Sequence, residues 1–176
     1  MGYLRHSGTW ALPRTCEGQW LRAAMLDRRD ERDRLVRTLN SGNAIGWNDD
    51  EPAVAEAAAE LVAQRYFGPD EPDPGKVARL TDAMAAGLDE ISRPLDRRDA
   101  DAAIWSALGA PSPGFDALSP GDRHVLRSAV VTVASVVMEL DEAAVDGLVR
   151  EAERVAFERG FHPPLAPKRR PAAERR

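Results

Sequence analysis

Two groups of carboxylates bracket an alanine-rich stretch in "NDDEPAVAEAAAELVAQRYFGPDEPDPG" (48–75). The six residues are Asp49, Asp50, Glu51, Asp70, Glu71 and Asp73. Grouped carboxylates are ligands for Ca²⁺ and Mg²⁺, and they also serve as general acids and bases. They are therefore the first residues in this sequence to test as a metal or catalytic site.

The spacing of these carboxylates argues against such a site. The residues between the groups, about Pro52 to Phe67, have helical apolar spacing, and a helix of this length spans about 24 Å. The two groups cannot share a metal ion within one molecule, and the D-x-D-x-D-G spacing of calcium loops is absent. Acids at a helix start satisfy free N–H groups. We interpret the six acids mainly as residues that begin and end helices.

The other reactive side chains are scattered. The single Cys16 excludes an intrachain disulfide and a multi-cysteine zinc site. His6, His124 and His162 show no paired spacing, and a Cys16–His124 nucleophilic pair is conceivable only from the residue types. The hydrolase G-x-S-x-G, P-loop and dinucleotide-binding motifs are also missing. The sequence therefore predicts no catalytic residue, no cofactor and no metal ligand.

The elements that carry these residues have helical signatures. Prolines placed at first helical positions mark starts at Pro52, Pro74 and Pro120, and Asp141 is a further cap candidate. Glycines mark the ends: Gly42, Gly68, Gly109 and Gly160. These signals predict an all-α fold, a compact bundle of about five to seven helices. The first element, about 17–40, is one helix or two, with Asp27 or Asp30 as the possible second cap.

One apolar stretch, "AVVTVASVVM" (129–138), is ambiguous because β-branched residues suit a strand. The Ser119 cap and the run of about 20 residues before Asp141 favour a helix at about 120–139. No charge occurs between Arg127 and Glu139. We therefore expect this helix at the centre of the bundle, buried nearly all round, with Val133 and Val136 both inside. Its apolar run is too short to cross a membrane.

The predicted organisation has three parts: an irregular segment at 1–16, a single helical domain at 17–161, and a flexible Pro/Arg-rich tail at 162–176. The tail, "HPPLAPKRRPAAERR", has too few apolar residues to offset the entropy of ordering. Truncation after Phe161 is accordingly expected to leave stability almost unchanged. Arg5, His6 and Arg14 interrupt any signal-peptide apolar core, so the sequence predicts a cytoplasmic protein.

Charge limits the possible partners. The formal net charge of −5 argues against general nucleic-acid binding. A helix-turn-helix is also disfavoured, because "SPGFDALSPGD" (112–122), at the place of the recognition helix, is Pro-broken and acidic. An alternative remains in the Arg-rich helix at 22–37 with the basic tail, which suit a regulator that touches nucleic acid.

The tryptophans and the acids suggest a surface for a protein partner. Trp20 and Trp105 lie on helical stretches and are expected in the core, whereas Trp10 and Trp47 lie in predicted loops. Trp47 is either a local apolar anchor beside a helix cap or an exposed binding anchor. An acidic surface selects basic partners by electrostatic complementarity. The candidate interaction residues are Trp47, Asp49, Asp50, Asp70 and Glu71.

Four segments carry a family resemblance: "QWLRAAMLD", "GWNDDEPAV", "RYFGPD" and "DGLVREAERVAFERGFHPPL". In this combination, most of the chain after residue 16 resembles small uncharacterised helical proteins of actinobacteria. The resemblance implies a bacterial origin, a compact α-fold and an accessory role, and it assigns no activity or site. Together, these observations predict a non-enzymatic helical interaction module, an adaptor or accessory subunit. Its partner would be another protein or a second copy, with nucleic acid as the alternative and no membrane.

Overall fold

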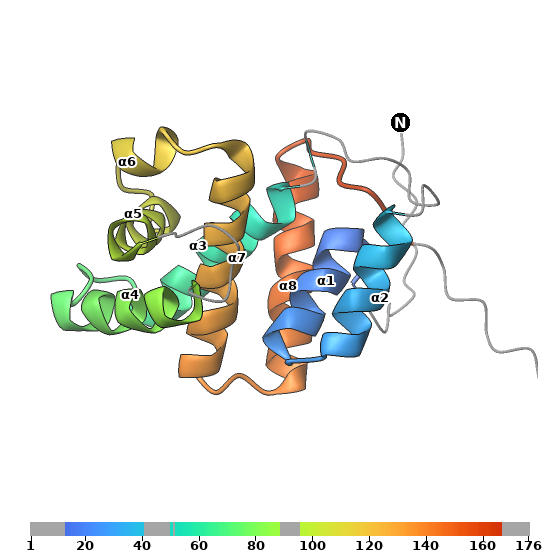
Figure 1. Ribbon diagram of the computed structural model, residues 1–176, viewed down its shortest axis with the longest axis horizontal. Helices are drawn as coiled ribbons and strands as arrows, with labels where there is room; N and C mark the ends of the chain where they lie inside the picture. The colour runs from blue at the N-terminus through green and yellow to red at the C-terminus, as the bar shows by residue number, and fades with distance from the viewer. Residues whose placement is uncertain (1–12, 41–49, 51, 89–95, 167–176) are drawn as a thin grey trace, which may run out of the picture.

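The computed structural model describes residues 13–40, 50, 52–88 and 96–166 (Figure 1). These residues form eight α-helices and no β-strand, which confirms the all-α class. The helices are α1 (Cys16–Met25), α2 (Arg29–Asn40), α3 (Ala53–Phe67), α4 (Pro74–Leu88), α5 (Arg97–Ala107), α6 (Pro113–Asp116), α7 (Pro120–Val137) and α8 (Glu142–Glu158). The number exceeds the expected five to seven because the first element is divided and because α6 adds a four-residue helix.

Local capping chemistry explains several of the helix ends. The Ser119 hydroxyl accepts a hydrogen bond from Asp122 N–H at the start of α7, and Asp141 accepts one from Ala144 N–H at the start of α8. Gly68 and Gly160 adopt φ angles of 85° and 88° at the ends of α3 and α8, in the left-handed region that suits glycine. The predicted boundaries at these positions are confirmed.

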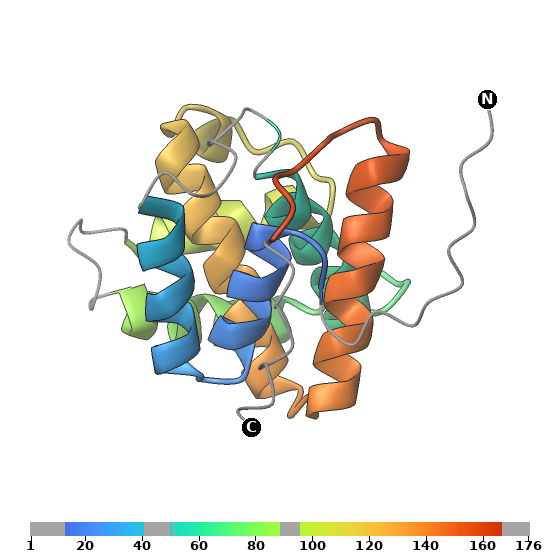
Figure 2. The ribbon, with the colours of Figure 1, turned by 90° about the vertical axis from the view of Figure 1, so that its right-hand side faces the viewer.

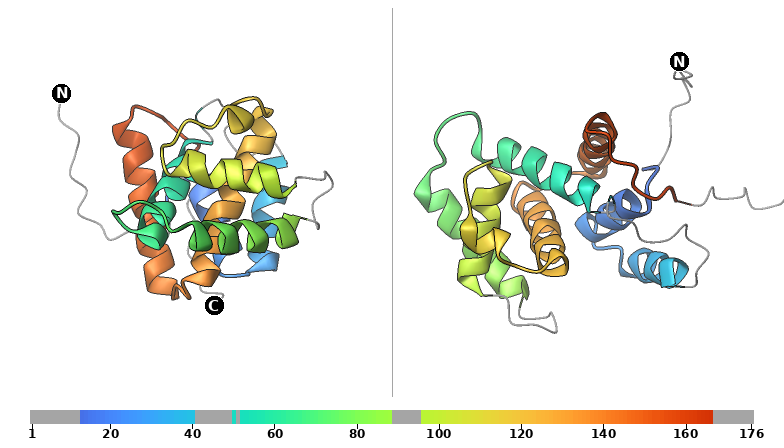
Figure 3. Two further views of the ribbon diagram at one scale, coloured as in Figure 1. Left: turned by 90° about the vertical axis from the view of Figure 1, so that its left-hand side faces the viewer. Right: turned by 90° about the horizontal axis from the view of Figure 1, so that it is seen from above.

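The segment from 17 to 40 is two helices. α1 ends at Met25 and α2 begins at Arg29, with Asp27 between them at a φ of 49°. Arg28 N–H donates to the Ala23 carbonyl and closes the turn. The hairpin that results places the arginine-rich α2 on the outside of α1 (Figure 3, right).

The helices α3 and α7 form the centre of the molecule. α7 packs on α1, α3, α4 and α5, and α3 also packs on α8. The helices α4 to α6 lie on one side of this pair, and α8, α1 and α2 lie on the other (Figure 1). The largest fully buried side chains are Phe115, Leu21, Leu80, Met84, Ile104, Leu126, Leu148, Val54, Val62, Val130 and Val131.

The expectation that α7 is buried nearly all round is wrong. Val130 is fully buried, but Val136 is 64% exposed and Val137 is 46% exposed. Of the two central helices, α3 has the larger buried fraction. Nine of its fifteen residues are buried, and six of those nine are alanine. Alanine lets neighbouring helices approach from several sides, although it adds little to an apolar pattern in the sequence.

The chain after α8 returns to the start of α1 (Figure 2). Cys16 N–H donates to the Pro164 carbonyl at 2.9 Å, and Ala166 N–H donates to the Arg14 carbonyl at 2.7 Å. Pro163 and Pro164 are both buried. The flexible tail predicted from residue 162 therefore disagrees with the structure at 163–166, because these residues pair with the segment before α1. Residues 167–176 lie outside the described part of the chain.

Candidate functional site

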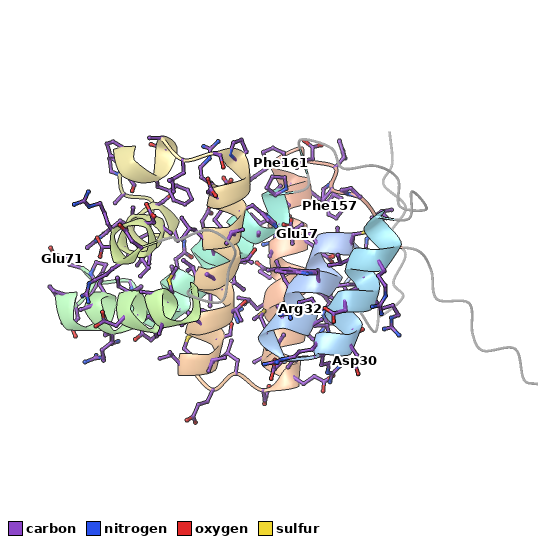
Figure 4. The ribbon with its side chains drawn as sticks, viewed as in Figure 1. Glu17, Asp30, Arg32, Glu71, Phe157 and Phe161 are labelled. Carbon is purple, nitrogen blue, oxygen red and sulfur yellow. The ribbon has the colours of Figure 1, made fainter. Side chains whose placement is uncertain are left out.

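The acids proposed as an interaction surface do not come together in the described structure. Asp50 lies before α3, where its carboxylate accepts a hydrogen bond from His162 N–H at 2.9 Å. Asp70 and Glu71 are exposed in the turn after α3, and Glu71 lies at the outer edge of the molecule (Figure 4). α3 has fifteen residues, so about 22 Å of helix separates them from Asp50. Trp47 and Asp49 lie outside the described residues.

The described acids of this set, Asp50, Asp70 and Glu71, do not belong to a group that could bind a metal ion. In the described ranges, no group of three His, Cys, Asp or Glu side chains could hold a metal ion. Asp73 accepts a hydrogen bond from Gly75 N–H at 2.9 Å in the first turn of α4. That contact supports the interpretation of Asp73 as a helix-capping residue.

The N-terminus of α3 is capped by a residue of a different helix. Pro52 precedes α3 and contributes no side-chain hydrogen bond. Glu17 of α1, which is 4% exposed, accepts hydrogen bonds on Oε2 from Val54 N–H at 3.1 Å and Ala55 N–H at 3.2 Å. Both donors belong to fully buried residues, so water cannot replace this carboxylate easily. Glu17 thus does what the sequence had assigned to the acids at 49–51.

The other oxygen of Glu17 faces His124 in the second turn of α7. His124 Nδ1 lies 3.2 Å from Glu17 Oε1. The centroids of the Trp20 ring and the imidazole are 6.4 Å apart. The His124 side chain is 25% exposed. Its burial and then the charge of Arg127 lower the pKa of His124 below the ordinary value of 6.5. The imidazole is therefore neutral at neutral pH.

A second buried carboxylate, Glu153 of α8, holds the start of α1. It accepts hydrogen bonds from Arg14 N–H at 3.0 Å, Thr15 N–H at 2.6 Å and the Thr15 hydroxyl at 2.7 Å. Gly18 lies against this carboxylate, because a Cβ on Gly18 would be 2.5 Å from Glu153 Oε1. The Thr15 hydroxyl in turn accepts a hydrogen bond from Gly18 N–H at 2.9 Å, so Thr15 caps α1 and Glu153 of α8 holds this cap in place, whereas Glu17 of α1 caps α3. We refer to Glu153, Glu17 and His124 together as the cap relay (Figure 4 labels Glu17).

An ion-pair cluster joins the α1–α2 hairpin to α8. Arg22 of α1 is buried and binds Asp146 through Nε at 2.5 Å and Glu142 through Nη2. Arg28, just before α2, binds the other oxygen of Glu142 at 2.7 Å. Both arginines are consequently paired with acids of α8, Arg22 at a buried position and Arg28 at the surface.

The cap relay resembles the carboxylate–histidine half of a hydrolytic triad, so its chemistry needs a test. Such a triad requires an accessible nucleophile hydrogen-bonded to the histidine. Ser128 lies one helical turn after His124, but it is buried and its hydroxyl has no hydrogen-bond partner within the described residues. Cys16 is also buried. The geometry therefore supports a role for the relay in helix docking.

Sequence reasoning missed Glu17, Glu153 and Arg22. One signal was available for Glu153, because this charged residue stands within an apolar stripe of α8, beside Val149, Ala152 and Ala156. A charge on the buried face of a helix requires a partner. The identity of that partner depends on the tertiary fold.

A separate feature is the outward side of α7. Val125, Ala129, Thr132 and Val133 are half-buried and Val136 is exposed, and their spacing places them along one side of the helix. We call these five residues the α7 face. No charged residue occurs between Arg127 and Glu139, so most of this face has no charged side chain of its own helix beside it.

Searches for related proteins gave no support for any family: no family model, curated protein or solved structure matches the chain. Among the described residues, none of the helices has the length and hydropathy of a membrane span.

Proposed function

We propose that the protein is a non-enzymatic helical interaction module that binds a partner through the α7 face. The observation that carries the proposal is Val136, which is 64% exposed within an uncharged run of eleven residues, Ser128 to Met138. The next residue, Val137, is 46% exposed, so two neighbouring valines of this run face solvent, and exposed apolar patches mark interaction sites on soluble domains. Surface valines that are scattered singly carry no such meaning.

The chemistry of this face fits an amphipathic helix of another protein. A partner helix with apolar residues at 3–4 spacing would lie along α7 and cover Val125, Ala129 and Val136. The small side chains of Ala129 and Thr132 in the middle of the face would allow close approach of the two helix axes. An adaptor or accessory role, a bacterial origin and a cytoplasmic location agree with this proposal and rest on the sequence alone.

This surface differs from the acidic surface predicted from the sequence. The described acids of that set, Asp50, Asp70 and Glu71, lie at opposite ends of α3 and cannot form one contact. The structure gives little support to the alternative of nucleic-acid binding through the Arg-rich segment. Arg22, Arg28 and Arg34 from the Arg-rich segment form ion pairs with acids of this chain. Phosphate binding would have to break those pairs, starting with the buried Arg22.

The test replaces one exposed valine and keeps a matched control. Val136→Asp places a charge on the α7 face, whereas Val36→Asp makes the same change at a valine of α2 that is 39% exposed. Both variants should keep the wild-type circular dichroism spectrum. In affinity capture from the native host with quantitative mass spectrometry, Val136→Asp should lose the bound protein that wild type and Val36→Asp retain.

Two results would change the conclusion. If Val136→Asp is folded and captures the same proteins as wild type, the α7 face is not the binding surface. If light scattering shows a wild-type dimer that Val136→Asp dissociates, the partner is a second copy of this chain.

A further inference from the structure

The turn after α7 holds an acidic residue in a backbone conformation that favours glycine. Glu139 adopts a φ of 53°, in the left-handed region. Its N–H donates to the Val136 carbonyl at 3.0 Å, and Leu140 N–H donates to the Ser135 carbonyl at 3.1 Å, which is the hydrogen-bonding pattern of a helix C-cap. The ends of α3, α5 and α8 have glycine in the left-handed conformation: Gly68, Gly109 and Gly160.

Glutamate is unfavourable at this position for two local reasons. A side chain strains the left-handed backbone, which glycine adopts freely. A carboxylate beside the C-terminus of a helix is also repelled by the free carbonyl groups and the negative end of the helix dipole. The last turn of α7 contains no basic residue that would offset this repulsion. Residues that break local rules in this way are concentrated at functional sites, so Glu139 requires a functional explanation.

Glu139 lies at the end of the α7 face, beside exposed apolar side chains. Val136 is 64% exposed, Val137 is 46% exposed and Met138 is half-buried. Glu139 itself is exposed, and so is Asp141 two residues later. Carboxylates next to an accessible apolar surface complement a partner that combines apolar residues with a positive charge.

The opposite end of the α7 face also carries an acid. Asp122 precedes Val125 by three residues and therefore lies on the same side of α7. If two copies packed through this face in antiparallel orientation, Asp122 of one copy would face Glu139 of the other. In parallel orientation, each acid would face its own counterpart. Like charges placed opposite each other oppose association, so the face suits a different, basic partner better than a second copy.

We propose that Glu139 selects the partner of the α7 face: a helix whose apolar stripe ends in a lysine or arginine, with this basic side chain bound to the Glu139 carboxylate. The inference rests on the proposed function, because it takes the α7 face as the binding surface, and it adds the chemistry of the partner. The positive charge of the partner would offset the repulsion between Glu139 and the end of α7. The glutamate that is unfavourable in the free protein is thus stabilised in the complex.

Photo-crosslinking of the full chain identifies the partner segment. Val136→Cys can be labelled selectively with benzophenone maleimide, because the only other cysteine, Cys16, is 2% exposed. The labelled protein is irradiated in a lysate of the native host, and the crosslinked peptide is sequenced by mass spectrometry. We expect a segment with apolar residues at 3–4 spacing and a lysine or arginine within about two helical turns of the crosslink. Val36→Cys on α2, labelled in the same way, should not crosslink to this segment.

Substitutions of two acids separate stability from binding. Asp27, outside the α7 face, also has a positive φ of 49°. Glu139→Gly and Asp27→Gly each remove a side chain from the left-handed region, so both should raise the melting temperature by about 2–4 °C. With labelled Val136→Cys at limiting concentration, the crosslinking yield should fall about two- to fivefold in Glu139→Gly and stay unchanged in Asp27→Gly. Glu139→Gln should show the same fall at low salt, which assigns the effect to the charge.

The outcomes distinguish this inference from the proposed function. If the crosslinked segment has no basic residue near the crosslink, or if Glu139→Gln keeps the full yield, the α7 face binds a partner without selecting its charge and the inference fails alone. A crosslinked segment of this same chain would identify a second copy and also overturn the inference. A lower melting temperature of Glu139→Gly would show that the glutamate serves the fold, with the same consequence. If labelled Val136→Cys crosslinks no more than labelled Val36→Cys, the proposed function fails as well.

Discussion

At the residue scale, the caps divide into those that the sequence shows and those that only the fold creates. Ser119 and Asp141 each bind an N–H group three residues later, so their pattern is visible in the chain. Glu17 binds N–H groups 37 and 38 residues away. No local rule connects such residues, which is why the role of Glu17 was assigned to the acids nearest α3.

Removing the Glu17 carboxylate should therefore be costly. Glu17→Ala leaves two buried N–H groups of α3 without their acceptor, and each such loss costs roughly 1–3 kcal/mol. We expect a decrease in unfolding free energy of about 2–4 kcal/mol in urea denaturation followed by circular dichroism. Glu158→Ala, at an exposed position of α8, is the control and should change stability by less than about 1 kcal/mol. An equal effect of the two substitutions would contradict the capping role of Glu17.

Two glycines make a second matched pair. Gly18→Ala would place a methyl group 2.5 Å from Glu153 Oε1 and 2.8 Å from Thr15 Oγ1, so the carboxylate would have to move and destabilise the variant. Gly147→Ala in α8 meets no atom within 4 Å and should stabilise the protein by about 0.5–1 kcal/mol through helix propensity. Melting temperatures of the two variants should shift in opposite directions. A stabilised Gly18→Ala would show that Glu153 adapts freely.

At the scale of elements, helix starts were predictable and burial was less so. Pro74 and Pro120 begin α4 and α7 as expected, because proline at the first helical turn acts locally. The run "AVVTVASVVM" is apolar on every side, so its pattern cannot indicate which side faces outward. The opposite difficulty applies to α3, which was predicted as a helix but whose extensive burial was not, because alanines fill most of its buried positions. Only the packing of the neighbouring helices distinguishes the two cases.

Two aspartate substitutions in α7 test this difference. Val130→Asp would bury a charge at a fully buried position, with a cost of several kcal/mol that approaches the stability of a small domain. Val136→Asp would leave its charge in water and should retain a cooperative melt. Thermal unfolding followed by circular dichroism distinguishes them. The sequence analysis placed Val136 inside the bundle, so loss of cooperative folding in Val136→Asp would restore the fully buried helix.

At the scale of the whole molecule, the two ends of the described chain stabilise each other. Thr15 and Leu165 form an antiparallel bridge, and Glu153 holds the same segment from α8. The composition of the region after Phe161, rich in proline and basic residues, predicted a flexible tail. Composition could not show that Pro163 and Pro164 are buried, because the segment with which they pair, Arg14 to Cys16, lies almost at the other end of the chain.

Truncation of the chain at two points measures this closure. A chain that ends at Phe161 loses the buried prolines and the hydrogen bonds that join Pro164 to Cys16 and Ala166 to Arg14. The lost contacts should lower the unfolding free energy by roughly 1–3 kcal/mol, since each hydrogen bond contributes about 1 kcal/mol. A chain that ends at Ala166 keeps all of these contacts and is the control. Calorimetry should show a clearly lower melting temperature for the shorter chain alone. Equal melting temperatures would mean that α1 docks without the returning segment, and the closure of the molecule would then depend on Glu153.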